Sequence, residues 1–136
     1  MRISGVTADT HIWIPLALGN HVDHQLVRLA AQQTELPGKR GYYEDYPYAE
    51  DAAAMQGITL PSSDLTARAV PVTAQDLDAK LAAISAYESQ LSSFWVDGAD
   101  MRQRVTDYAV RAGGGAPAER LWVRGVYDTS IKLLDD

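Results

Sequence analysis

Residues 11–24 read HIWIPLALGNHVDH, and this stretch carries most of the information about the fold. Its first part, His11–Leu16, is a short apolar run closed by Gly19-Asn20, and that length and boundary favour a buried strand over a helix. Pro15 is expected at the C-terminal end of the strand, because proline cannot donate a ladder hydrogen bond. The stretch therefore predicts a strand that leads into a glycine turn.

A helix is predicted next, over residues 22–35. Its apolar side chains recur at helical spacing, at Val22, Leu26, Leu29 and Ala30, and Pro37-Gly38 ends it. A strand followed by a glycine turn and a helix is an α/β unit, which predicts a parallel sheet at this point.

Similar patterns predict the remaining elements. Strands are expected at Gly41–Pro47, Ala67–Val72 and Arg120–Tyr127, and helices from Thr73 to Trp95 and over Asp100–Ala112. The helix from Thr73 is expected to have that residue as its N-cap, with Asp76 in its first turn. The last helix is expected to bury Met101, Val105, Tyr108 and Ala109 and to stop at Gly113–Gly115. With no internal repeat or linker visible, residues 1–136 are interpreted as a single domain.

The composition is that of an ordinary globular protein, with 136 residues, 46% hydrophobic and 22% charged. The formal net charge of −6 argues against nucleic acid or an anionic membrane surface as a partner. There is no cysteine, which excludes disulfides and thiolate metal sites. The apolar run Ile12–Leu18 is too short for a signal peptide, and no segment reaches the roughly 20 apolar residues of a membrane span. We therefore expect a cytoplasmic protein.

The strand-to-helix junction also holds the best candidates for chemistry. His21 and His24 lie three residues apart, so both rings can face the same side of the first helical turn. Asp23 could accept a hydrogen bond from one of the rings and fix its tautomer. In open α/β sheets, ligands collect at the carboxyl ends of strands and near helix N-termini, which is where this cluster falls.

Two interpretations of this cluster stay open. It could be a metal or acid–base site, or it could be a solvated helix start whose spacing arises by chance. A catalytic zinc ion needs three protein ligands, and residues 19–24 supply at most two or three, so a metal would need a ligand from elsewhere in the protein. His11, the third histidine, is expected to be a structural or surface residue.

A second candidate site consists of Glu44, Asp45 and Tyr46, with further tyrosines at positions 42, 43 and 48. Tyrosine rings stack on sugars and carboxylates accept hydrogen bonds from hydroxyls, so this segment could contact a carbohydrate. The alternative is a loop whose tyrosines bury their rings and keep their hydroxyls in water.

Four segments, taken together and in order, resemble the GlcNAc-phosphatidylinositol de-N-acetylase family, also called LmbE-like or PIG-L. Trp13–His24 resembles the family's strand and His-x-Asp-His motif, and Tyr43–Tyr48 its Tyr-Glu-Asp-x-Pro-Tyr segment. Lys80–Gln90 is similar to its long-helix signature, and Glu119–Trp122 to its closing strand. These matches cover nearly the whole chain.

The resemblance implies part of a Rossmann-like, mostly parallel sheet flanked by helices. It also implies a hydrolase that uses Zn²⁺ to remove an N-acyl group, such as acetyl, from a glucosaminyl-type substrate. In that case His24 is a zinc ligand, His21 protonates the leaving amine or stabilises the oxyanion, and Asp23 orients His21. Glu44, Asp45 and Tyr46 are then expected to contact the substrate.

The chain departs from the family at the family's first motif. Members carry Ala-His-Pro-Asp-Asp-Glu near the N-terminus, which supplies two metal ligands and the catalytic base, and no segment of this sequence matches it. We therefore expect the C-terminal portion of a deacetylase domain whose metal site needs a complementary N-terminal half. The partner could also be a second copy in a homo-oligomer. The alternatives are a non-catalytic interaction protein that retains the fold and a carbohydrate-binding module.

Overall fold

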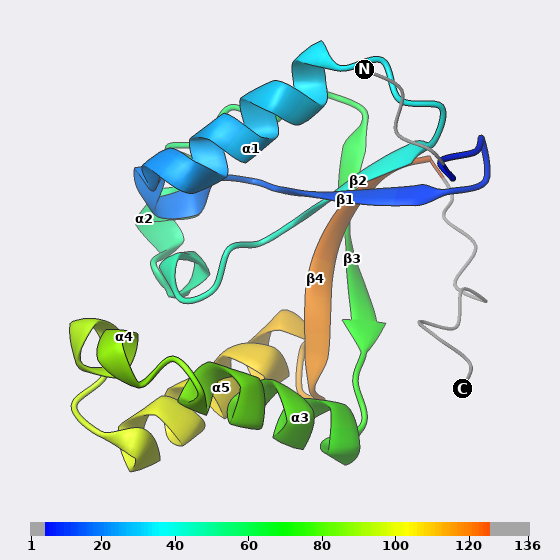
Figure 1. Ribbon diagram of the computed structural model, residues 1–136. Coiled ribbons are helices and arrows are strands. Elements are labelled where there is room, and N and C mark those ends of the chain that lie inside the picture. The colour runs from blue at the N-terminus through cyan, green and yellow to red at the C-terminus, as the bar shows by residue number, and fades with distance from the viewer. Residues whose placement is uncertain (1–4, 126–136) are drawn as a thin grey trace. The chain divides into compact units, whose positions relative to one another are not determined.

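The computed structural model describes residues 5–125, and the chain divides into two compact units (Figure 1). Unit 1 consists of Met1–Arg68 and Leu121–Asp136, and unit 2 consists of Ala69–Arg120. Compact units can belong to one domain, so the prediction of a single domain stays a prediction. Within residues 5–125, no helix combines the length and the apolar character needed to cross a lipid bilayer.

Within residues 5–125, four strands form one mixed sheet in the order β1-β2-β4-β3. They are β1 (His11–Pro15), β2 (Lys39–Tyr43), β3 (Leu65–Pro71) and β4 (Ala118–Arg124). β1 and β2 run parallel, with Ile14 opposite Tyr42, whereas β2 and β4 run antiparallel, with Tyr42 opposite Trp122. The predicted α/β class with a helix-flanked sheet is confirmed, and the predicted strand that begins at His11 is β1.

In the described residues the sheet is mixed, with one parallel pair, and not mostly parallel as expected. β3 and β4 are antiparallel, because Val72 donates its N–H to Pro117 while the Thr66 hydroxyl donates to the carbonyl of Val123. Residue numbers therefore rise along one strand as they fall along the other. Parallel pairing requires a crossover connection, usually a helix, and among the three pairs of neighbouring strands only β1 and β2 follow one another through a single helix.

Unit 1 contains α1 (Val22–Gln33), α2 (Ala52–Gln56) and two short 3-10 helices, η1 (Leu18–Asn20) and η2 (Tyr48–Glu50). Its core is formed by buried side chains of the strands and of the turn after β1, among them Ile14, Leu16, Leu18, Tyr42 and Val123. The predicted helix over 22–35 is confirmed as α1. None of the residues of α1 is fully buried, so the helix contributes little to this core.

Unit 2 contains α3 (Ala74–Ser85), α4 (Glu88–Phe94) and α5 (Gly98–Ala112). The predicted start of α3 is confirmed: Thr73 and Asp76 form a capping box, in which each side chain bonds the backbone N–H of the other residue. The prediction of one helix from Thr73 to Trp95 is wrong, because the chain leaves helical geometry at Tyr87. The apolar spacing there calls for an apolar residue at position 88, and the residue is Glu88, which instead begins α4.

The other helix and the last strand are close to prediction. α5 buries Met101, Val105, Tyr108 and Ala109, and it ends at Gly113. β3 and β4 each begin two residues earlier than expected, as does β2. The expected end of the last strand, Tyr127, lies outside the described residues.

Candidate functional site

The candidate site begins where β1 ends, at a sharp turn of the chain. Ala17, Gly19 and Asn20 have left-handed backbones, with φ of 61°, 71° and 57°. Gly19 is required for a second reason, because a Cβ at that position would collide with the ring of Tyr48. The turn places His21 at the N-cap of α1 in an extended conformation.

His21 caps α1 with its own ring. Its Nδ1 accepts a hydrogen bond of 3.3 Å from the backbone N–H of Asp23, which satisfies one of the unpaired donors of the first helical turn. A ring nitrogen that accepts a hydrogen bond carries no proton, so this bond assigns the proton of the neutral ring to Nε2. The Asp23 carboxylate lies 3.9 Å from the same Nδ1, and its side chain is 75% exposed. Asp23 therefore orients His21 mainly through its backbone N–H, since exposed charge pairs are weak.

His24 lies on the inner side of the same turn, against a buried carboxylate. Its Nδ1 is 2.8 Å from Oδ1 of Asp45, and the Asp45 side chain is fully buried. Neither atom has another hydrogen-bonding partner among the described residues, so each is the polar partner of the other. A carboxylate at this distance favours the proton on Nδ1, which leaves Nε2 of the neutral ring as an acceptor or metal ligand.

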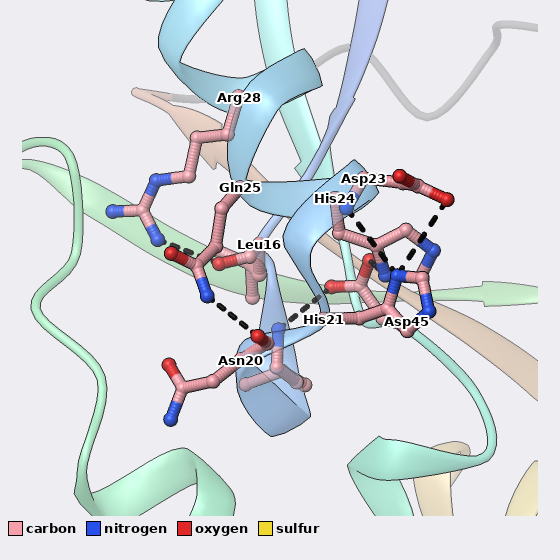
Figure 2. A network of polar contacts seen from close by, with 9 residues as sticks. Leu16, Asn20, His21, Asp23, His24, Gln25, Arg28 and Asp45 are labelled. Carbon is pink, nitrogen blue, oxygen red and sulfur yellow. Dashed lines mark hydrogen bonds and ion pairs between the residues drawn. The ribbon is translucent and has the colours of Figure 1, made fainter.

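Asp45 is held at this position from two sides. Its second oxygen, Oδ2, accepts the backbone N–H of Leu18 at 3.1 Å. Burial raises the pKa of the Asp45 carboxyl above its ordinary value, while the Leu18 N–H and the nearby His24 oppose that rise. Asp45 thus ties the turn after β1 to the loop after β2 and orients the His24 ring (Figure 2).

The ring of Tyr48 completes the cluster. Its centroid lies 6.2 Å from that of His21 and 5.9 Å from that of His24, and the two histidine rings are 5.3 Å apart. Figure 2 shows His21, His24 and Asp45 gathered on one side of the first turn of α1, while Gln25 and Arg28 extend to the other side. We refer to His21, His24, Asp45 and Tyr48 as the histidine cluster.

The other residues of the second candidate site contact neighbours within unit 1. Glu44 is buried and accepts a hydrogen bond of 3.0 Å from the indole N–H of Trp122. Tyr46 is half-buried and donates its hydroxyl to Glu50 at 2.8 Å. The structure thus brings Asp45 to the histidines but directs the Glu44 and Tyr46 side chains to other partners.

Sequence reasoning missed the link between the two candidate sites. His24 and Asp45 both follow strands that pair in parallel, with Pro15 opposite Tyr43, so the residues after the two strands meet at one edge of the sheet. The rule that ligands collect at the carboxyl ends of parallel strands could have predicted this meeting. Tyr48 was visible only as the last residue of the tyrosine-rich segment.

The cluster offers only part of a metal site. Among residues 5–125, no group of three or more His, Cys, Asp or Glu side chains is arranged to hold a metal ion. His24 has the arrangement expected of a metal-binding histidine. The Asp45 carboxylate contacts its Nδ1, and its Nε2 is directed away from that carboxylate. The residues present therefore fit one zinc ligand and do not fit a complete zinc site.

Comparison with known proteins identifies the fold. No family model and no curated protein sequence matches the chain. Among solved structures, the zinc-inhibited form of teicoplanin deacetylase Orf2 matches with a TM-score of 0.68 and 24% identity, over 88% of this chain and 47% of Orf2. The A40926 pseudoaglycone deacetylase Dbv21 matches with a TM-score of 0.64 and 23% identity, over 88% of this chain and 51% of Dbv21.

A deacetylase–bog complex from the teicoplanin biosynthesis pathway gives a TM-score of 0.66 and 25% identity, over 88% of this chain and 48% of that one. The chain therefore has an α/β fold found in deacetylases, and it spans about half the length of the solved structures it matches. Membership of the de-N-acetylase family stays a prediction.

Proposed function

We propose that this chain is part of a zinc-dependent N-deacetylase, a hydrolase that cleaves the amide of an N-acylated amino sugar. The observation that carries the proposal is the contact between His24 and the buried Asp45 at the end of two parallel strands. It prepares one imidazole nitrogen for a ligand in a fold that solved deacetylases share.

Each residue of the histidine cluster has a distinct role in this proposal. His24 is a zinc ligand through Nε2, and Asp45 is a positioning residue that fixes its ring and tautomer. The neutral His21 ring carries its proton on Nε2, so it can donate a hydrogen bond to the oxyanion. To protonate the departing amine, His21 would act as the imidazolium, whose Nδ1–H would face the Asp23 carboxylate 3.9 Å away. Asp23 keeps the His21 ring in that orientation by donating its backbone N–H to Nδ1.

The zinc site requires ligands from a polypeptide outside the described residues, because these supply only one ligand in suitable form. When bound, Zn²⁺ would supply a Lewis acid for amide hydrolysis. A complementary half of the deacetylase fold is the source we propose for the remaining ligands and the base.

The substrate is proposed to lie beside the loop that follows β2. This loop carries Glu44, Asp45 and Tyr46 and brings Tyr48 to within 6.2 Å of both histidine rings, measured between ring centroids. A sugar bound at His21 would therefore border the same tyrosine-rich segment, where rings and hydroxyls suit a carbohydrate. A carbohydrate-binding module without catalysis is the second candidate, and glycan binding that needs no metal would favour it.

Zinc titration of the purified chain by calorimetry tests the proposal. We expect weak binding that His24→Ala abolishes and that the control His11→Ala preserves, since His11 begins β1 at the other end of that strand. If the weak zinc binding is unchanged in His24→Ala, His24 is not a zinc ligand. A tight one-to-one site in the isolated chain would instead contradict the need for outside ligands.

A further inference from the structure

Helix α1 presents its aliphatic residues away from the core of its own unit. Val22, Leu26 and Leu29 are 61%, 58% and 49% exposed, and their spacing places them in one stripe along the helix. His24, Arg28 and Ala31 are the half-buried residues of the helix. A helix normally buries its aliphatic face, so this arrangement leaves an apolar stripe (Val22, Leu26, Leu29) without a partner in unit 1 among the described residues.

The apolar stripe forms one wall of an open cleft within unit 1. The cleft has a volume of about 710 Å³, and its other lining residues include Ala54 in the middle of α2 and Ile58 and Thr59 after that helix. Arg28 links the two walls, because its guanidinium donates to the carbonyl of Leu16 and to that of Thr59, each at 2.6 Å. These hydrogen bonds therefore fix α1 against the end of β1 and the segment that follows α2.

We propose that this cleft is the docking surface for the polypeptide that completes the deacetylase fold, an inference that rests in part on the proposed function. The partner is an apolar helix or extended segment whose side chains pack on the apolar stripe. A polypeptide face can cover such an open apolar stripe.

Two observations favour a complementary polypeptide over a second copy. The solved deacetylases contain about as much chain again as the part that this chain matches, and that remainder needs a surface to pack on. A second copy would bring another formal charge of −6 against the first, which opposes association. The cleft lies on the side of α1 that carries Gln25 and Arg28, so the docked segment covers the helix on the side away from the histidine cluster.

The test uses the part of teicoplanin deacetylase Orf2 that the match leaves uncovered, expressed separately and mixed with this chain in the presence of a chelator. We expect a one-to-one complex by size-exclusion chromatography with light scattering. Leu26→Asp and Leu29→Asp should each weaken it roughly 30-fold or more, the loss typical of a central apolar contact. Val27→Asp is the matched control, because Val27 is 54% exposed on the same helix but does not line the cleft, and it should preserve the complex.

Three results would overturn the inference: no complex with the Orf2 segment, a complex that Leu26→Asp leaves intact, or a dimer of this chain that the stripe variants dissolve. The isolated variants give a check that needs no partner. Leu26→Asp should unfold at the same temperature as Val27→Asp, and a lower midpoint would show that the stripe belongs to the chain's own core. Because zinc is absent throughout, failure of the zinc proposal would leave these results unaffected.

Discussion

Replacement of Asp45 by alanine should destabilise unit 1 more than any other change in the histidine cluster. Its Oδ2 is the partner of the Leu18 N–H, and Leu18 is only 1% exposed, so water cannot replace the lost acceptor. A buried donor left without a partner costs about 1–3 kcal/mol. Nδ1 of His24 also loses its only described partner, and because that ring is 33% exposed this adds about 0.5–1 kcal/mol.

The expected loss for Asp45→Ala is therefore about 1.5–4 kcal/mol of unfolding free energy, lowered somewhat by removal of a buried charge. Asp45→Asn keeps an oxygen for the Leu18 N–H, so its loss should be smaller, about 1 kcal/mol. Asp78→Ala, an exposed aspartate of α3, is the control and should stay within about 0.5 kcal/mol of the parent.

Urea unfolding followed by circular dichroism and by tryptophan fluorescence measures these differences. Trp13 and Trp122 lie in unit 1 and Trp95 lies in unit 2, so two of the three tryptophans report on the unit that contains Asp45. If Asp45→Ala unfolds at the same urea concentration as Asp78→Ala, the carboxylate does not secure the turn after β1. The assignment of Asp45 as a positioning residue would then be wrong.

Three further outcomes are expected. Gly19→Ala should lower the unfolding free energy by about 1–3 kcal/mol, because φ at position 19 is positive and the new Cβ meets the Tyr48 ring. In a Tyr48→Ala background part of this loss should disappear, and urea unfolding of the single and double variants measures the difference. Hydrogen bonds from Thr73 hold the pKa of the Asp76 carboxyl below its ordinary 3.8. The ionised carboxylate therefore stabilises α3 fully above pH 3.8, and this stabilisation is lost as the pH falls through the lower pKa of the folded state. An NMR titration of Thr73→Ala should show the Asp76 pKa rising toward 3.8. Val105→Ala, at 1% exposure in unit 2, should lower the unfolding free energy by about 2–4 kcal/mol, and a loss below about 1 kcal/mol would contradict the buried position.

Local patterns predicted the elements of this fold well where one face of a segment decides its structure. His11–Leu16 was recognisable as a strand from its length and its glycine boundary, and α5 from four apolar residues that all proved to be buried. The prediction of one long helix was wrong at Tyr87 because it carried the apolar face from Ile84 to Leu91 past Glu88, where the spacing calls for an apolar residue. In each of these three segments, the secondary structure depends on contacts between residues that are close in the sequence.

The candidate site was predictable only in part, because its central contact joins distant segments. The His-x-x-His spacing identified His21 and His24, but the partner of His24 is Asp45, and their meeting depends on the parallel register of β1 and β2. The apolar stripe of α1 shows a different limit. An amphipathic pattern indicates that a helix has an apolar face but not whether that face belongs to its own core or to a partner.

The left-handed turn after β1 has a consequence for how this sequence can vary. Ala17 is buried and adopts φ 61°, ψ 42°, a conformation that costs an alanine about 1–2 kcal/mol. Substitutions at this position should therefore favour glycine or asparagine, and β-branched residues should be selected against. Across related sequences, we expect position 17 to vary among small, turn-tolerant residues while Leu16 and Leu18 on either side vary only among large apolar ones.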